Sequence, residues 1–167
     1  MTSLDLFAIK ERVVDILKSD TTNLWDSTPN DKTKFRKIEA GSPSPKAIQE
    51  PPLPRCWVTS DQNVATQTQH MVVTNNQGNG EEWDIRLLIY LVVEAKDGSD
   101  TEEKIDDFTK AIVELLDNNY DLRTPGGLES TRVAEASEII AITDLPAMFK
   151  GDRVRGRVIR LKVIVRA

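Results

Sequence analysis

Few residues in this chain have the types and spacing that catalysis or metal binding requires. His70 is the sole histidine of the 167 residues, and Cys56 is the sole cysteine. A histidine pair for a metal is therefore excluded within one chain, and a Ser-His-Asp arrangement would have to use His70, which no nucleophile motif accompanies. Cys56 cannot form an intrachain disulfide, and a cysteine-based zinc site would need partner chains. We interpret His70 as an exposed strand residue and expect no catalytic residue, cofactor or metal.

Two further patterns resemble ligand sites but lack the necessary spacing. Gly78-Asn79-Gly80 lacks the third glycine, the preceding buried strand and the following helix of a dinucleotide-binding loop, so it predicts a turn. Six acidic residues lie between Asp97 and Asp107, without the alternate spacing and terminal glutamate of an EF-hand loop. Most of them fall on a predicted helix, where they suit the positive end of the helix dipole. This pattern favours a solvated helix start.

The C-terminal strand carries the third candidate, a row of cations. Residues 150–166 contain seven basic side chains and one acid. Arg153, Arg155 and Arg157 share one parity and could line a channel for DNA, because arginine binds phosphate without reading sequence. However, no aromatic residues interleave to stack bases. Pairing with acidic partners, or protection of a sheet edge, is the favoured interpretation, and non-specific DNA contact is the alternative.

The elements that position these residues centre on one strand, Glu82 to Ala95. Its odd-numbered residues, Trp83 to Val93, are all apolar and predict one buried face. The opposite face is charged at both ends and apolar in the middle, at Leu88, Tyr90 and Val92. We expect this second face to be covered too, either by a helix of the chain or by a neighbouring subunit. This strand favours an assembly protein over an enzyme.

The other elements follow from periodicity and turn chemistry. Helical spacing predicts a helix from Leu6 to Lys18 or Ser19, capped by Ser3 or Asp5, and a second from a capping box at Ser99 to Asn118 or Asn119. The remaining predicted elements are a short strand at 35–40, a proline-rich crossing at 41–54, a strand at 55–59, a polar hairpin arm at 61–82 with a flexible tip at 75–80, a Pro-Gly loop at 124–127, and strands at 132–142 and 153–165. The charges of the last strand change parity near 156–159, which predicts a β-bulge.

Together these elements predict a single domain over residues 1–167. The expected fold is α+β: a mixed, mainly antiparallel sheet with two helices on one face and a long β-hairpin arm. The composition is 39% apolar and 29% charged with a net charge of -5, which gives no general case for nucleic-acid binding. No signal peptide is apparent, and the longest apolar run is too short for a membrane helix. We therefore expect a soluble protein made in the cytoplasm, with no membrane partner.

The element order, the run Leu53-Pro54-Arg55-Cys56-Trp57-Val58, the long aliphatic strand and the acidic helix ending in Leu115-Leu116-Asp117-Asn118-Asn119 resemble a known family. They are similar to the tail terminator, or tail-completion, proteins of long-tailed phages and related archaeal viruses. The resemblance spans nearly the whole chain but includes no catalytic signature. It implies a virion structural protein, assembled in the host cytoplasm. Such a protein caps the tail tube as a ring, expected to be a hexamer, and joins the tail to the neck.

The partners that this resemblance implies are further copies of the chain, the tail tube protein and a neck or head-completion protein. No functional residue of the family can be transferred position by position, so the predicted interface comes from the residues alone. It consists of the hairpin arm, the second face of the long strand, the Pro-Gly loop and the basic strand. The residues are His70, Val72, Thr74, Asn76, Asn79, Tyr90, Pro125, Gly126, Arg153, Arg155 and Arg157.

Two alternatives remain open. One is a neck or head-completion (stopper) protein, which also forms a ring but binds on the portal side. The other is a small enzyme or ligand-binding domain with a pocket between helix and sheet, for which a chemical role would have to emerge at Asp84, Tyr90 or Glu94. The absence of a nucleophile motif, a metal cluster and a phosphate loop from the sequence argues against the second alternative.

Overall fold

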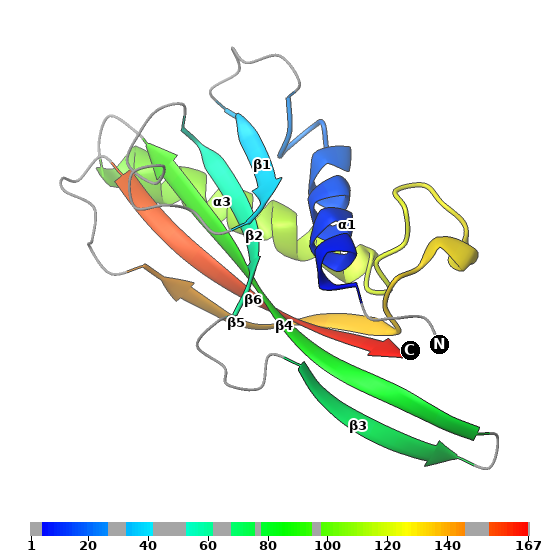
Figure 1. Ribbon diagram of the computed structural model, residues 1–167. Helices are drawn as coiled ribbons and strands as arrows, with labels where there is room; N and C mark the ends of the chain where they lie inside the picture. Colours follow the sequence, from blue (N-terminus) through cyan, green and yellow to red (C-terminus); the bar gives the residue numbers. More distant parts are fainter. Residues whose placement is uncertain are drawn as a thin grey trace.

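The computed structural model shows two α-helices and a six-stranded sheet in the part of the chain that it describes (Figure 1). That part comprises residues 5–26, 33–41, 53–61, 68–75, 78–94, 98–145 and 154–166, and in 68–82, 98–100 and 154 only the backbone is described. The elements are α1 (Leu6–Ser19), β1 (Lys37–Ala40), β2 (Arg55–Ser60), β3 (Thr68–Asn75), β4 (Gly78–Glu94), α3 (Gly98–Asn118), the 3-10 turn η1 (Glu129–Thr131), β5 (Ala136–Asp144) and β6 (Val154–Arg166).

The strands form one mixed sheet in the order β1-β2-β4-β6-β5. β1 runs parallel to β2, and every other pair is antiparallel. β4 has two successive partners on one edge, because residues 87–92 pair with β2 and residues 78–85 pair with β3. On the other edge β6 pairs with β4 from Glu82 to Glu94. The fold is therefore α+β with a mainly antiparallel mixed sheet, as predicted.

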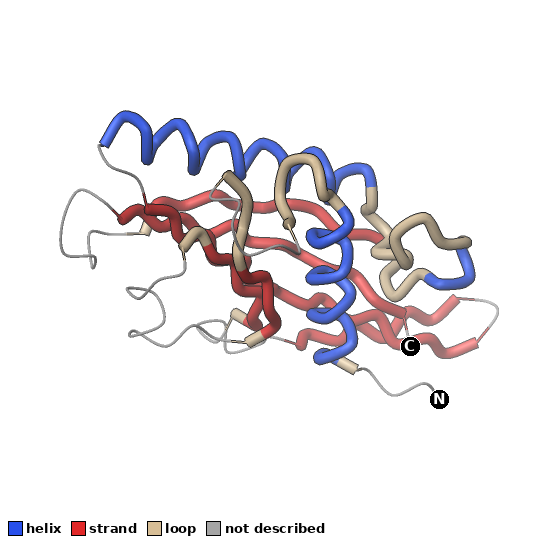
Figure 2. The backbone as a smooth tube through the Cα atoms, turned by 90° about the horizontal axis from the view of Figure 1, so that it is seen from above, coloured by secondary structure: helices blue, strands red, loops and turns tan. Residues whose placement is uncertain are grey.

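The core lies between this sheet and the two helices; Figure 2 shows α3 lying along the sheet and α1 crossing it. The predicted face of β4 is buried apart from the partly buried Trp83, and most of the apolar residues expected to face the core from the two helices are buried. The exceptions are the partly buried Leu6 and Leu115 and Phe7 of α1, which is 62% exposed. Phe35 stacks on Phe108 with ring centroids 4.1 Å apart, which joins the segment before β1 to α3. Each fully buried aliphatic or aromatic side chain contributes about 1.5–3 kcal/mol to folding. The buried β4 residues of this face are Ile85, Leu87, Ile89, Leu91 and Val93.

The second face of β4 is covered at Val92 by the chain itself. Leu53 and Trp57 pack on Val92, and Tyr90 is half-buried against this small cluster. Leu88 is also buried. The residues that pack on Val92 thus come from the start of β2 and the residue before Pro54, and the expectation that a helix covers this position is wrong. Because Leu88 and Val92 are already buried in one chain, they provide no apolar surface for a neighbouring subunit.

The helix ends follow from local chemistry. The Asp5 carboxylate accepts a hydrogen bond of 3.0 Å from the Ala8 N–H. Asp5, one of the two predicted caps, is therefore the N-cap residue of α1, which begins at Leu6. Ser3, the other predicted cap, lies outside the described residues. α3 begins at Gly98, and the side chains of the predicted capping box at Ser99 also lie outside the described set. None of the helices in the described residues combines the length and apolar character that a membrane span needs.

The β-bulge predicted near residues 156–159 is wrong, and the bulge of this sheet lies in β5 instead. β6 pairs with β4 in an unbroken register from Val154 to Arg166. The extra residue is Ile140 of β5, because the register between β5 and β6 shifts between Ile139 and Ala141. The change of charge parity in β6 has another cause. Arg157 lies on the helix-covered face, where Asp106 of α3 pairs with it, whereas Arg160 lies on the opposite face and pairs with Asp61.

Candidate assembly surface

The β3–β4 hairpin arm extends past the body of the domain (Figure 1). β6 ends opposite Glu82, yet β4 begins at Gly78, so residues 78–81 have β3 as their partner in the described part of the chain. At about 3.4 Å per strand residue, this extension is about 13 Å long. The register pairs Asn75 with Gly78, so the two strands continue into the predicted tip. The prediction of a flexible tip over residues 75–80 is therefore wrong, because residues 75 and 78–80 belong to strands. The arm is a regular two-stranded ribbon almost to its end.

Both edges of this ribbon are open among the described residues. β3 pairs there with β4 and with no further strand, and residues 78–81 have no partner on the side where β6 ends. Unpaired strand edges attract other strands, and proteins normally protect them with lysine, proline or a bulge. Residues 61–80 contain no lysine, arginine or proline. The backbone of the arm is therefore free to bind a partner, and its sequence lacks the usual protection against this.

Four of the predicted interface residues fall on this ribbon. The backbone places His70, Val72 and Thr74 at alternate positions of β3, paired with Trp83, Glu81 and Asn79 of β4 respectively. Asn76 lies outside the described residues. The structure thus brings His70, Val72, Thr74 and Asn79 together on one element.

The predicted Pro-Gly loop is a compact, internally bonded structure. Its neck is closed by a hydrogen bond of 3.1 Å from the Thr124 N–H to Thr131 Oγ1. Gly126 adopts a φ of +69°, which favours glycine. A Cβ atom at Gly127 would lie 2.8 Å from the Thr124 carbonyl oxygen and 2.9 Å from Thr131 Oγ1, so only glycine fits there. Pro125 lies in the turn that these contacts define. The loop is rigid enough to present a fixed surface.

The neck of this loop is also fastened to the rest of the domain. The Arg12 guanidinium of α1 donates to the Leu122 carbonyl at 3.0 Å and to the Thr131 carbonyl at 2.5 Å. On the Leu122 side of the neck, the Arg123 side chain donates a hydrogen bond of 2.7 Å to the buried Asp121 carboxylate. This hydrogen bond holds the pKa of Asp121 below its ordinary value, against the effect of burial.

The basic strand does not form a row of free arginines. Arg157 is largely buried and donates to Asp106 of α3 at 2.7 Å, to Asp144 of β5 at 2.8 Å and to Thr109 at 3.1 Å. It therefore joins three elements of its own chain. Arg155 is exposed, and Arg153 lies outside the described residues.

On the opposite face of the sheet, cations pair with neighbouring acids. Arg160 binds the buried Asp61 at 2.9 Å, and Arg86 binds Asp84 at 2.9 Å. Lys162 lies 3.8 Å from Glu138. Together with Arg157, these residues pair cations of the strands with acids of the same chain.

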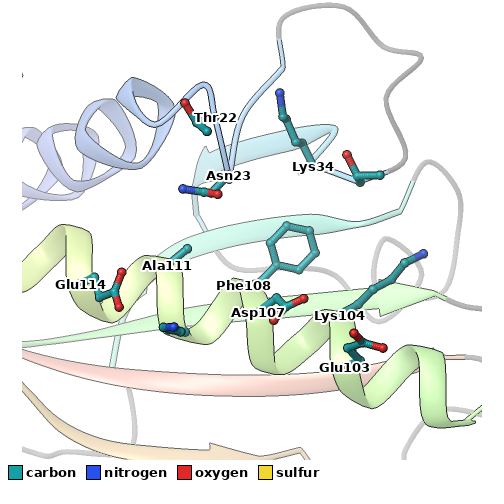
Figure 3. Close-up of a pocket in the computed structure, with 11 residues that line it drawn as sticks. Thr22, Asn23, Lys34, Glu103, Lys104, Asp107, Phe108, Ala111 and Glu114 are labelled. Carbon is teal, nitrogen blue, oxygen red and sulfur yellow. The ribbon is translucent and has the colours of Figure 1, made fainter.

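A polar groove of about 610 Å³ lies between α3 and the loop residues before β1, whereas the ligand-binding alternative expected a pocket between helix and sheet (Figure 3). It runs between α3 and the segments on either side of residues 27–32, with Phe108 among the lining residues. Lys34 donates to the Thr21 carbonyl at 2.7 Å, which directs this cation to the backbone. Three lysines and three acids line the groove: Lys34, Lys104, Lys110, Glu103, Asp107 and Glu114. Their charges cancel, so the groove favours neither an anion nor a cation.

Asp84, Tyr90 and Glu94, on which an enzymatic role would depend, lie outside the lining of this groove. Asp84 is bound to Arg86, and Tyr90 packs on the cluster around Trp57. In the described part of the chain, no group of three or more His, Cys, Asp or Glu residues is placed to hold a metal ion. Of these three residues, Glu94 is exposed, and the other two make the contacts just described.

Exposed apolar side chains add a feature that sequence reasoning missed. Leu128 is 77% exposed at the end of the Pro-Gly loop, and Ile140 and Ile142 are 41% and 48% exposed on β5. The available signal for Leu128 was an apolar residue directly after a Pro-Gly-Gly turn, within an otherwise polar run. The exposure of Ile140 had no such signal, because it depends on the bulge and on the edge position of β5.

No protein-family model matches this chain, and no curated protein matches it. Among solved structures, the chain is similar to a chain from a structure described as "Virion of native gene transfer agent (GTA) particle", with 12% sequence identity and a TM-score of 0.46. The match covers 98% of this chain and 100% of that chain.

Proposed function

We propose that this chain is a virion structural protein that caps the end of a viral tail tube as a ring, stops tube polymerisation and joins the tail to the neck. The observation that supports this most directly is the hairpin arm. An isolated two-stranded hairpin is marginally stable in water, and this one extends about 13 Å beyond the last paired residue of β6. A partner that pairs with the arm would stabilise it.

A tube end and a neighbouring subunit both offer such a partner. A tube built from sheets presents unpaired strand edges at its growing end, and an arm with open edges and no protecting cations pairs with them by backbone hydrogen bonds. The domain body has a different surface, with ion pairs on one face of the sheet and helices on the other. Such a body offers the next tube ring nothing equivalent to bind, so polymerisation stops at this subunit.

The test shortens the arm and leaves the body intact. Residues 73–80 are replaced by Asn-Gly, so that the paired residues Val72 and Glu81 flank a two-residue turn of the type that favours hairpins. The matched control is Gln77→Gly, which keeps the arm at full length. Circular dichroism and thermal melting check the fold, and negative-stain images of purified tail tubes measure capping and tube length.

We expect the shortened variant to melt like the control but to leave tubes uncapped and longer. Unchanged capping by the shortened arm would contradict the proposed role of the arm. The same images separate a terminator from a stopper, because a stopper binds the portal side and leaves tube length unaltered.

A further inference from the structure

We infer that the hairpin arm can exist in two registers: β3 can slip by six residues along β4, which transfers six residues of chain to the tip of the arm. We call the register of the structure the short-tip register and the slipped one the long-tip register. The inference concerns the free protein and goes beyond the proposed function. It starts from the way in which β2 and β3 share one edge of β4.

β2 and β3 lie in line on this edge, and both run antiparallel to β4. β2 ends at Ser60, which pairs with Leu87 of β4. β3 begins at Thr68, which pairs with Ile85. A single residue of β4 separates the two partners, whereas seven residues of the chain separate Ser60 from Thr68. A continuous strand would need one residue in this place, so six residues are in excess of what the edge requires.

Asp61 already follows the path of a continuous strand. Its N–H donates to the carbonyl of Arg86 at 3.1 Å, and Arg86 is the β4 residue that a strand continuing from β2 would meet next. Residues 62–69 could then pair with β4 from Ile85 to Gly78. This long-tip register would pair the same eight residues of β4 that the short-tip register pairs. The slip therefore conserves the number of paired residues in the arm.

The slip also keeps the two faces of the ribbon. A slip by an odd number of residues exchanges the faces of a strand, whereas a slip by six preserves them, and strands that are polar on both faces specify their register weakly. Residues 62–80 contain no acid, lysine, arginine or proline, so no formal charge and no missing N–H favours one register. In the long-tip register Trp83 would pair with Val64 in place of His70, and pairs of aromatic and β-branched residues stabilise sheets.

The slip changes the reach of the arm. In the short-tip register two residues, 76 and 77, connect the strands, because Asn75 pairs with Gly78. In the long-tip register Gln69 would pair with Gly78, and the eight residues 70–77 would form the tip. Three more residues on each side lengthen the arm by up to about 10 Å. Loop entropy changes slowly with loop length, so the cost of the longer tip is small. Such an arm fits partners at different distances from the body.

Cysteine pairs that share Asn79→Cys measure the register. Thr74→Cys faces position 79 in the short-tip register, and Thr68→Cys would face it in the long-tip register. Without a slip, position 68 lies six strand residues from the partner of position 79, about 20 Å, which is too far for a disulfide. Each variant is oxidised with glutathione disulfide, and non-reducing peptide mapping measures the rate of the intrachain bond. The native Cys56 is buried and does not compete.

Gln69→Cys with Asn79→Cys is the matched control. Its disulfide would need a slip of five residues, which exchanges the faces, although position 69 starts about 3 Å nearer to position 79. We expect the Thr68→Cys pair to form its bond roughly tenfold faster than this control, because only the even slip preserves the faces. Equal rates would overturn the inference, since fraying of the arm brings both pairs together.

Deleting residues 62–67 removes the six residues in excess. Asp61 then directly precedes Thr68, so the short-tip register is kept and the slip is impossible. The bond between positions 68 and 79 should fall to the control rate in this background, while the bond between positions 74 and 79 forms as before. A 68–79 bond that survives the deletion would contradict the slip. Neither readout uses tail tubes, so its failure leaves the proposed capping role standing, and a failure of capping leaves the slip standing.

Discussion

Arg157 provides the sharpest test of how this domain is held together. Its guanidinium binds Asp106 of α3, Asp144 of β5 and the Thr109 hydroxyl, so one side chain links β6 to a helix and to the edge strand. Replacing it by methionine keeps much of the buried aliphatic stem and removes the charge. The variant therefore isolates the polar contacts from the packing.

The magnitude follows from the exposure of the partners. Asp106 and Asp144 are 60% and 75% exposed, so each ion pair contributes about 0.2–1 kcal/mol rather than the larger value of a buried pair. The hydrogen bond to Thr109 adds about 0.5–1.5 kcal/mol. Removing a largely buried charge relieves its desolvation cost and offsets part of this sum. We expect Arg157→Met to lose about 1–2 kcal/mol of unfolding free energy, drawing on these ranges, which corresponds to about 2–8 °C in melting temperature.

Denaturant unfolding and thermal melting measure this loss, and a double-mutant cycle with Asp106→Asn assigns it. Asp106→Asn should be destabilising in the native background and nearly neutral beside Arg157→Met. Arg155→Met is the control, because Arg155 is exposed on the same strand and its loss should cost less than about 0.5 kcal/mol. Equal effects of Asp106→Asn in both backgrounds would refute the clamp. In that case Arg157 would not be held by Asp106 and could contact a partner or DNA.

Two further predictions concern titratable groups. Because Arg123 lowers the pKa of Asp121, the ionised pair stabilises the fold above the unfolded pKa of about 3.9, and this contribution is lost as pH falls through the lower folded value. Arg123→Ala should thus destabilise the domain at pH 7 and progressively less below about pH 4, measured by denaturant unfolding; a pH-independent difference would refute this. Burial raises the pKa of the Cys56 thiol, so it should react with a thiol reagent only on unfolding, and fast labelling of the native chain would contradict its position in the core.

Local periodicity made much of the fold predictable. The alternation in β4 and the helical spacing around Val13 and Ile112 report which side of an element is apolar, and that side is the one that packs. The loop at Gly126 was predictable for a similar reason, because its turn chemistry lies within a few residues. The cover over Val92 was not. It comes from Leu53 and Trp57, whose position depends on how β2 pairs with β4 far along the chain.

The bulge shows the same limit. The charge parity of β6 predicts a bulge in that strand, but a strand of unbroken register produces the same pattern when its cations lie on both faces and acids approach each face. Asp106 and Asp61 do so here, from positions 51 and 99 residues away. The extra residue, Ile140, is on the neighbouring strand, where nothing in its own sequence distinguishes it from a regular strand residue.

The sequence by itself determined which side of β4 and of each helix packs into the core, where α1 begins, that a polar hairpin precedes the long strand, and that catalytic constellations are lacking among its motifs. These properties depend on side-chain type and on spacing within one element. Tertiary structure alone decided that β4 extends beyond β6, that Arg157 is bound within its own chain, and that Leu128 and Ile142 are exposed. Strand register and burial arise from contacts between distant segments, and no local pattern encodes where those segments meet.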